Sequence, residues 1–204
     1  IDMVSLMTPV VKSLFSDMGM EITSDAMQIY GGYGYTKDQG IEQLYRDNRI
    51  TPIYEGTNSI QAIDLVFRKL VNKNGDIIDE YLKMIKNEIQ ISDEKIKPYS
   101  QKLEKNIDIL NNFTSWIKDK IINSKDDANA ACNDYLKVLG LIAIAHSWIK
   151  VLEVSFKEYT KNKEFYDEKI QTANFFFDRV LPRIESYYLT GTAGSKYIMD
   201  FKFN

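Results

Sequence analysis

The chain has 204 residues, of which 44% are hydrophobic, 12% aromatic and 27% charged. That apolar content is enough to bury a core, so the composition excludes an intrinsically disordered chain. The net charge is −3, whereas nucleic-acid-binding domains usually carry an excess of positive charge, so we expect no nucleic-acid partner. One cysteine, Cys132, and one histidine exclude an internal disulfide and leave too few ligands for zinc, so no metal site is expected.

Neither a membrane span nor a secretion signal is evident in the sequence. The longest apolar stretch, 138–145, is far shorter than the ~20 residues that cross a bilayer. The N-terminus has no charged region followed by an apolar one, as a signal peptide would. The chain begins with Ile1 rather than Met, which suggests a fragment or a processed product.

The first predicted helix follows Thr8 and Pro9, a capping residue and a proline at the first helical position. It ends at Gly31 and Gly32. Apolar residues recur along it at intervals of three and four, which predicts one buried face. The residues of this face are Val11, Phe15, Met18, Ile22, Ala26 and Ile29.

Two shorter helices come next. The first covers 41–49, because Pro52 blocks its continuation. The second begins near Asn58 and stops before Asn74 and Gly75. Its apolar side is predicted to hold Ile60, Ile63, Phe67 and Leu70.

Beyond Gly75 the sequence predicts four more amphipathic helices and no period-two strand. The segment 135–156 is apolar on nearly every side, which is typical of a buried central helix. The fold class is therefore all-α, an up-down helical bundle, with a kink expected at Pro182. The other stripes are Ile78, Leu82, Ile85 and Ile89; Leu103, Ile107, Leu110, Phe113, Ile117 and Ile121; and Ile170, Ala173, Phe177, Val180 and Ile184.

Several conspicuous residues are better explained by structure than by chemistry. His146 lies on an apolar helix face, which favours a satisfied core histidine. Cys132 sits beside small residues and is expected to be an inert buried thiol. The charges in 93–105 indicate a solvated helix face, and the aromatic run 175–177 indicates core.

The first third of the chain differs, because it holds seven of the ten glycines and three motifs. Gln28-x-x-Gly31-Gly32-x-Gly34 comes first, followed by Tyr45-Arg46-Asp47-x-Arg49-Ile50 and then Ile53-Tyr54-Glu55-Gly56-Thr57. In this order and spacing they resemble the C-terminal helical domain of the flavin-dependent acyl-CoA dehydrogenases, over about the first 70 residues.

The rest of the chain, ending in Thr192-Ala193-Gly194-Ser195, resembles the extra helical region of the long bacterial members, such as the methylmercaptopropionyl-CoA dehydrogenases. We therefore divide the chain into 1–74, part of the C-terminal helical domain with its catalytic-base segment, and 75–204, an additional helical region.

The resemblance implies that Glu55 is the base that removes the proton alpha to the acyl-CoA thioester carbonyl. A glutamate just before a helix is normally explained by its attraction to the positive end of the helix, which is worth ~0.3–1 kcal/mol, without any catalytic role. A carboxylate with a solution pKa of ~4.3 is a weak base, so such a site must exclude water and stabilise the enolate oxygen with hydrogen bonds. The beta hydrogen leaves as hydride to the flavin. Tyr54 and Gly56 would contact the substrate.

The resemblance also implies two groups of FAD contacts. One touches the FAD of a neighbouring subunit and comprises Gln28, Ile29, Tyr30, Gly31 and Gly32, with Gly34 extending the close backbone approach. The other is Thr57, Asn58 and Ser59, at a helix start whose N–H groups favour an anion or a flavin edge. Asn58 replaces the small hydroxyl residue common in the family, but is a sound cap.

The charged residues of the second motif are predicted to be structural, with direct contact to a ligand as the alternative. Arg46, Asp47 and Arg49 precede the Glu55 loop and would orient it through buried, charge-assisted hydrogen bonds.

As partners the resemblance implies FAD, an acyl-CoA substrate, the missing N-terminal and middle domains of the same enzyme, and further copies in a dimer or tetramer. It also implies an electron-transfer flavoprotein or similar acceptor and a location in the bacterial cytoplasm. Without the missing domains the chain should be inactive. Two alternatives stay open: a non-catalytic helical oligomerisation or binding module, and part of a flavin acyl-CoA oxidase.

Overall fold

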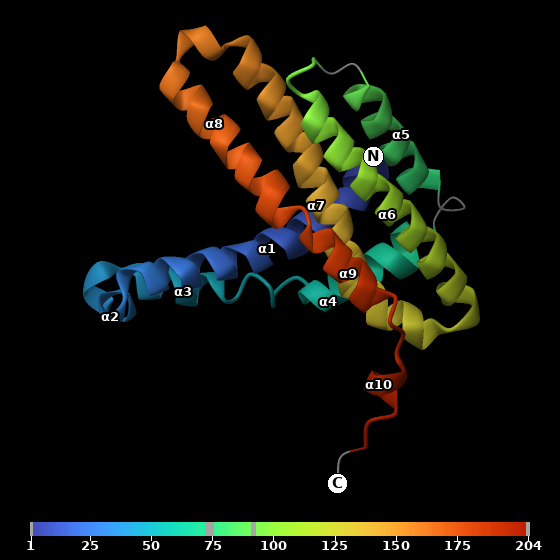
Figure 1. Ribbon diagram of the computed structural model, residues 1–204. Helices are drawn as coiled ribbons and strands as arrows, with labels where there is room; N and C mark the ends of the chain where they lie inside the picture. Colours follow the sequence, from blue (N-terminus) through green and yellow to red (C-terminus); the bar gives the residue numbers. More distant parts are fainter. Residues whose placement is uncertain (1, 72–75, 91–92, 203–204) are drawn as a thin grey trace.

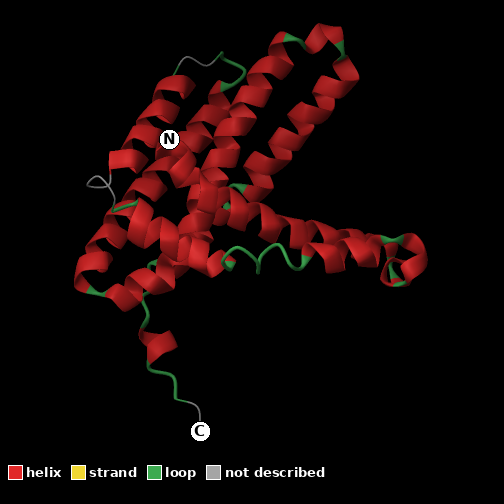
Figure 2. Cartoon of the chain, turned by 180° about the vertical axis from the view of Figure 1, so that it is seen from behind, coloured by secondary structure: helices red, strands yellow, loops and turns green. Residues whose placement is uncertain are grey.

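The computed structural model describes residues 2–71, 76–90 and 93–202. Within these ranges every regular element is a helix, which confirms the all-α prediction (Figure 2). The α-helices are α1 (Asp2–Tyr30), α2 (Gly32–Tyr35), α3 (Ile41–Asn48), α4 (Asn58–Asp64), α5 (Asp76–Ile89), α6 (Lys97–Asn123), α7 (Lys125–Lys157), α8 (Lys163–Phe175), α9 (Arg183–Gly191) and α10 (Lys196–Met199). Short 3-10 turns are η1 (Lys37–Gln39) and η4 (Tyr159–Lys161), and π-helical turns are η2 (Leu65–Lys69) and η5 (Phe176–Val180).

The helices form a bundle with a projecting arm (Figure 1). Helix α7 is central and contacts α1, α4, α6, α8 and α9. The arm is the C-terminal part of α1, with α2 at its far end and α3 packed alongside. The segment between α3 and α4 runs back along the arm toward the bundle (Figure 1).

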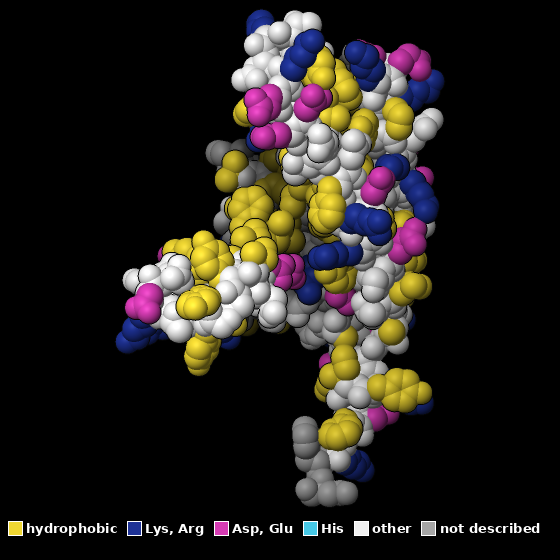
Figure 3. Space-filling model, turned by 60° about the vertical axis from the view of Figure 1, so that its left-hand side comes forward, with side chains coloured by type: hydrophobic (Ala, Val, Ile, Leu, Met, Phe, Trp, Pro, Cys, Tyr) yellow, Lys and Arg dark blue, Asp and Glu magenta, His cyan; other side chains and the backbone are white. Residues whose placement is uncertain are grey.

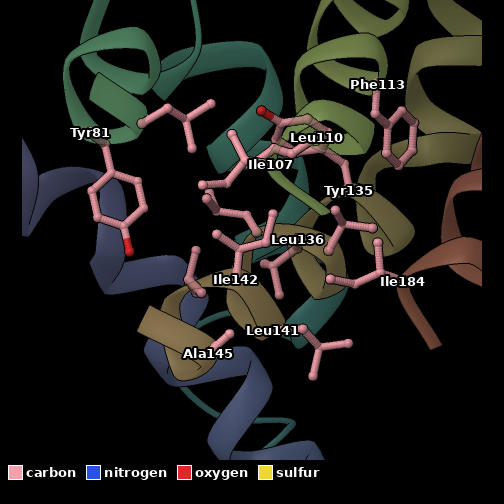
Figure 4. Close-up of a cluster of buried hydrophobic side chains, with 14 of the residues drawn as sticks. Tyr81, Ile107, Leu110, Phe113, Tyr135, Leu136, Leu141, Ile142, Ala145 and Ile184 are labelled. Atoms are coloured by element: carbon pink, nitrogen blue, oxygen red, sulfur yellow. The ribbon is translucent and has the colours of Figure 1, made fainter. Parts of the chain in front are cut away.

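The core of the bundle follows the predicted apolar stripes (Figure 4). All four residues of the α5 stripe are buried, as are all but Ile121 of the α6 stripe. The predicted central helix 135–156 is the main part of α7 and supplies Tyr135, which is fully buried. The Tyr135 hydroxyl lies 2.8 Å from Thr114 Oγ1, so the polar group of this core residue is hydrogen-bonded.

Among the described helices, α7 alone is long and apolar enough to cross a membrane by length and composition. More than half of its most apolar window, 56%, is buried within the chain. A core helix shows the same pattern, so this is weak evidence for a span.

Helix α1 differs from the prediction at its start and on its faces. It begins at Asp2, so Pro9 lies inside it, and Thr8 Oγ1 donates to the carbonyl of Val4 at 2.7 Å instead of capping a helix. Burial of Leu6 against the bundle explains why the helix extends past the proline.

The predicted buried face of α1 is largely solvent-exposed. Val11, Phe15, Ile22 and Ile29 are 47–84% exposed, whereas Leu6, Val10 and Leu14 pack inward. An apolar stripe predicts burial against some partner, and within the described residues that partner is absent for most of this face.

The helix that starts at Asn58 buries only part of the side that was predicted, since Leu70 is buried and Phe67 packs against the core. Ile60 and Ile63 are exposed, while the buried residues of this segment are Ala62, Leu65, Val66 and Leu70. The π-helical bond from the Leu70 N–H to the Leu65 carbonyl, 2.9 Å long, shifts the helical register and keeps Leu70 inside. The predicted stop before Asn74 and Gly75 lies outside the described residues.

The last predicted stripe is interrupted where the kink was expected. Helix α8 passes into η5, and α9 begins directly after Pro182. Ala173, Phe177 and Ile184 are buried, and Ile170 and Val180 pack against the core cluster.

The structural explanations for the other conspicuous residues are mostly confirmed. His146 is buried, with Nε2 2.7 Å from Glu88 Oε2. Cys132 is buried, and burial raises the pKa of its thiol to about 12. Of the aromatic run, Phe176 and Phe177 are buried, but Phe175 is exposed, so that part of the prediction was wrong.

The charged residues of 93–105 are solvated, as predicted, and two of them also form inter-helix ion pairs. Lys102 Nζ lies 2.5 Å from Asp178 Oδ1, and Lys105 Nζ lies 2.9 Å from Glu185 Oε1. Both pairs join α6 to the C-terminal half of the chain at exposed positions, where ion pairs contribute little.

Candidate functional site

Glu55 lies in a cleft of about 290 Å³ between α1 and the segment that joins α3 to α4. Val11, Lys12, Phe15 and Ser16 line it from α1, and Asn48, Thr51, Tyr54 and Glu55 line it from the other side. Tyr54 and Glu55 were predicted as site residues, and the structure places both in this cleft. The hydrophobic side chains along the arm and in the hollow beside it are visible in Figure 3.

The backbone at Glu55 is in a conformation that residues with a side chain rarely adopt. Its φ is +54°, and Glu55 is the only described non-glycine residue with positive φ. The left-handed region costs a residue with a Cβ about 1–2 kcal/mol. Gly56 follows at φ +83°, where glycine carries no such penalty. Strain of this kind persists only where surrounding contacts hold it, and it concentrates at functional sites.

Three hydrogen bonds hold this turn. Gln61 Nε2 donates to the Glu55 carbonyl at 3.0 Å, and Lys12 Nζ donates to the Gly56 carbonyl at 2.8 Å. The Asn58 N–H donates to the Pro52 carbonyl at 3.1 Å and closes the loop. Contacts from both α1 and α4 therefore fix the main chain that carries Glu55.

Asn58 does not cap α4, contrary to the prediction. Thr57 is the N-cap, and its Oγ1 accepts from the Ile60 N–H at 3.3 Å. The Asn58 side chain instead reaches α1, where Nδ2 donates to Asp17 Oδ1 at 2.6 Å and to Ser16 Oγ at 2.9 Å. Thr57 and Asn58 are both competent caps, and the sequence does not show which side chain a neighbouring helix will engage.

The segment 28–32 lies at the far end of the arm. The Gly31 N–H donates to the Gln28 carbonyl at 3.1 Å, and Gly31 has φ +60°, so it ends α1 as predicted. Gln28, Ile29, Tyr30, Gly31 and Gly32 are all exposed. A Cβ on either glycine would meet nothing within 4 Å, which leaves their backbone open to a bound group.

Gly34, which was predicted to extend the close backbone approach to the flavin, packs against α1. It is buried, and a Cβ there would lie 2.6 Å from the Met27 carbonyl oxygen and 2.8 Å from the Tyr30 Cβ. The glycine is needed for α2 to fold back on α1.

The two predicted groups of cofactor contacts are well separated. Asn58 bonds to Ser16, whereas Gln28 is twelve residues further along α1. At 1.5 Å per residue this is about 18 Å along the helix axis. Thr57, Asn58 and Ser59 follow Glu55 closely along the chain but do not line its cleft, and the segment 28–32 lies further away along α1.

Within the part of the chain that the structure describes, Arg46, Asp47 and Arg49 do not form the predicted buried bonds. All three residues are exposed, and Arg46 Nη2 pairs with Glu42 Oε1 of its own helix at 3.1 Å. Helix α3 has no buried residue, so these charges remain in water.

The surroundings of Glu55 in the described residues are open to solvent. The Glu55 side chain is exposed, so the described residues alone do not exclude water from it. No group of three or more potential metal-ligating His, Cys, Asp or Glu side chains occurs in the described ranges.

Sequence reasoning missed Lys12, Ser16, Asp17 and Gln61. Lys12 is the only basic residue of α1, and this could have drawn attention to it. That its side chain reaches the Glu55 loop depends on tertiary packing, which the local sequence does not show. The other sequence feature that could have indicated these contacts is Asn58, which stands where the family commonly has a small hydroxyl residue.

Comparisons with known proteins agree with the motifs. Residues 2–70 match the family described as "Acyl-CoA dehydrogenase, C-terminal domain", and residues 80–202 match the family described as "Acetyl-CoA dehydrogenase C-terminal like". The chain is 41% identical over 83 residues to the 3-methylmercaptopropionyl-CoA dehydrogenase of Ruegeria pomeroyi, which is 41% of this chain and 14% of that protein. It is 54% identical over 52 residues to the acyl-CoA dehydrogenase of Bacillus subtilis, which is 26% of this chain and 14% of that protein.

Solved structures share the fold. An acyl-CoA dehydrogenase complexed with FAD from Bacillus anthracis superposes with a TM-score of 0.69 at 17% identity, over 98% of this chain and 33% of that one. ACDH-11 of Caenorhabditis elegans, in complex with C11-CoA, gives the same TM-score at 18% identity, over 100% of this chain and 34% of that one. The chain thus spans about a third of these structures and about a seventh of the curated relatives. From the family matches, which together cover most of its length, the chain belongs to the acyl-CoA dehydrogenase family and corresponds to its C-terminal helical region.

Proposed function

We propose that the chain is the C-terminal portion of an FAD-dependent acyl-CoA dehydrogenase, in which Glu55 is the base that removes the alpha proton of an acyl-CoA thioester. The observation that carries this proposal is the geometry of Glu55. It stands on a strained turn with φ +54°, in a cleft, with the carbonyls of both Glu55 and Gly56 tied to neighbouring helices. A glutamate placed only to favour a helix start would need none of these contacts.

In this proposal the residues of the chain bind and orient the substrate and take one proton. The Glu55 carboxylate accepts the alpha proton, and its backbone N–H donates to the thioester oxygen as enolate charge develops there. Tyr54, half exposed beside Glu55, forms part of the wall for the acyl group. FAD, when bound, accepts the beta hydrogen as hydride.

The residues proposed to hold FAD fit a flavin in two places. Exposed hydroxyls of Thr57 and Ser59 lie at the start of α4, next to Glu55. The open glycine turn at 28–32 lies about 18 Å away along α1. We propose, from the resemblance and not from this separation, that the open turn contacts the FAD of a neighbouring subunit in a homo-oligomer.

The exposed apolar face of α1 supports the need for the remaining parts of the family fold. Phe15, Ile22 and Ile29 would stay in water if nothing packed on the arm. Packing of further domains on this face would bury it and remove water from Glu55. We therefore propose that these residues alone do not turn over substrate, and that electrons pass on to an electron-transfer flavoprotein or a similar acceptor.

The test compares wild type, Glu55→Gln and a matched control, Glu80→Gln, in a flavin-loaded enzyme that contains these residues with the preceding domains. Glu80 is exposed on α5, away from the cleft. Acyl-CoA thioesters of several lengths are added without oxygen, and bleaching of the flavin is followed by absorbance.

We expect wild type and Glu80→Gln to bleach, and Glu55→Gln to keep its flavin but remain yellow. Equal bleaching of all three proteins would place the base elsewhere. Formation of hydrogen peroxide during aerobic turnover would favour the oxidase alternative. Failure of the wild type to bind flavin would favour a non-catalytic module.

A further inference from the structure

The turn that carries Glu55 is attached to α1 through one lysine. The Lys12 ammonium donates to the Gly56 carbonyl at 2.8 Å and to Asn58 Oδ1 at 2.7 Å. An ammonium has three donors and no acceptor, so two of the three are used on the segment 56–58. Lys12 is partly buried, and its charge is directed at this segment.

The orientation of the Asn58 amide is determined by the groups around it. Oδ1 faces the Lys12 ammonium, while Nδ2 donates to the Asp17 carboxylate at 2.6 Å and to the Ser13 carbonyl at 3.2 Å. A flipped amide would place its NH2 against an ammonium and its oxygen against a carboxylate. Asn58 therefore connects a cation and an anion of α1 through one rigid group, and this group sits at the first residue of α4.

This arrangement opposes the relaxation of Glu55. A residue with a Cβ leaves the left-handed region readily when nothing holds it. Rotation about Glu55 would move the Gly56 carbonyl, whose oxygen Lys12 binds, and the Glu55 carbonyl, whose oxygen Gln61 binds. The same rotation would change the directions in which the N–H and the side chain of Glu55 point relative to one another.

We propose that Lys12 is a positioning residue for the reaction of Glu55. It acts with Asn58 and Gln61 through the main chain at Glu55 and Gly56, because its ammonium is directed at the segment 56–58. The inference rests on the proposed function of Glu55 as the base.

The first measurement concerns the backbone and needs no flavin. Amide hydrogen exchange is followed by NMR in the 204-residue chain as wild type, Lys12→Met, Lys12→Arg and the control Lys83→Met, which makes the same change at an exposed position of α5. The Asn58 N–H reports on the loop, because it is bonded to the Pro52 carbonyl. In Lys12→Met we expect its exchange to accelerate about tenfold or more, with Lys12→Arg close to wild type.

The second measurement uses the flavin-loaded enzyme. Displacement of a reacting group by about 1 Å costs up to about 100-fold in rate, so Lys12→Met should lower kcat about 10- to 100-fold. Because the Lys12 ammonium binds the segment 56–58, a positioning role predicts that KM and flavin content stay within about threefold of wild type, and that Lys12→Arg recovers most of kcat.

Each outcome decides the inference. Unchanged Asn58 exchange in Lys12→Met, or a rise in KM with kcat intact, would overturn it. If Lys12→Met fails to fold, Gln61→Leu makes the same test from the Glu55 carbonyl with α1 unaltered. If Lys12→Met speeds exchange of the Asn58 N–H while Glu55→Gln keeps full turnover, Glu55 is not the base, but Lys12 still holds the main chain of the turn. If Glu55→Gln is inactive and Lys12→Met is fully active, the positioning role is refuted alone.

Discussion

Alkaline pH should unfold this protein through its buried acids. Burial, with a smaller contribution from the negative charge of Glu88, raises the pKa of Tyr81 from 10.0 to about 12. Burial raises the pKa of Cys132 from 9.0 to about 12 and also raises that of Tyr135. In each case the folded state holds a proton that the unfolded state loses, so the stabilisation is complete below the unfolded pKa and falls as pH rises above it.

The loss of unfolding free energy depends on how far the pH lies above the pKa of each group in the unfolded state. Each group costs about 1.4 kcal/mol of unfolding free energy per pH unit. At pH 11 the thiol is two units above 9.0 and each tyrosine one unit above 10.0, which gives about 5–6 kcal/mol in total. Domains of this size are stable by about 5–15 kcal/mol, so most or all of a modest stability would be lost.

Urea unfolding at pH 8 and pH 11, followed by far-UV circular dichroism, measures this loss. Tyr81→Phe keeps the ring and removes one titrating group, so its loss between the two pH values should be smaller than that of wild type by about 1.4 kcal/mol. Tyr197→Phe, at a position 87% exposed on α10, is the matched control and should behave as wild type. Identical losses in all three proteins would refute the reasoning, since Tyr81 would then titrate equally in both states.

Two further predictions concern packing between α6, α7 and α9. Gly191→Ala would overlap the buried ring of Phe113 and approach Asp134 Cβ to 3.1 Å, so we expect a loss of about 1–3 kcal/mol in calorimetric stability; an unchanged Tm would show that the ring has room to move. Thr114→Val would remove the partner of the buried Tyr135 hydroxyl and cost about 1–3 kcal/mol by urea unfolding, whereas Tyr135→Phe combined with Thr114→Val should recover part of this; equal losses in the single and double variants would contradict that coupling.

The amphipathic helices of the bundle were predictable because the apolar residues of each fall on a single helical face. In α5 and α6 the stripes have a helical period, the opposite face is charged, and the stripe residues are buried, apart from the partly buried Ile121. Helix α1 is apolar on more than one side. Its sequence offers both Leu6, Val10 and Leu14 and the face that includes Phe15, and local pattern cannot say which set the chain itself covers.

At the site, the position of the turn was predictable and its internal contacts were not. Gly56 next to Glu55 indicates an unusual backbone, but positive φ at Glu55 itself depends on donors 43 residues away, at Lys12, and six residues on, at Gln61. Arg46 and Asp47 were expected to form buried bonds because charged pairs beside a site often do. Helix α3 has no buried residue, so the described part of the chain leaves Arg46 and Asp47 in water.

The strain at Glu55 and the exposure of α1 are connected. The bundle is held by a continuous apolar core centred on α7, while the arm beyond Leu14 contacts mainly α2, α3 and α4. The Glu55 turn is thus bonded on one side to an arm whose apolar face remains exposed and on the other to α4, which packs on α7. An isolated helix has little stability of its own, so packing on the arm would reinforce the contacts that already hold this turn. Burial of Phe15 and Ile22 by the rest of the family fold would both rigidify α1 and dehydrate the cleft, and the two requirements for Glu55 to act as a base would be met by one packing event.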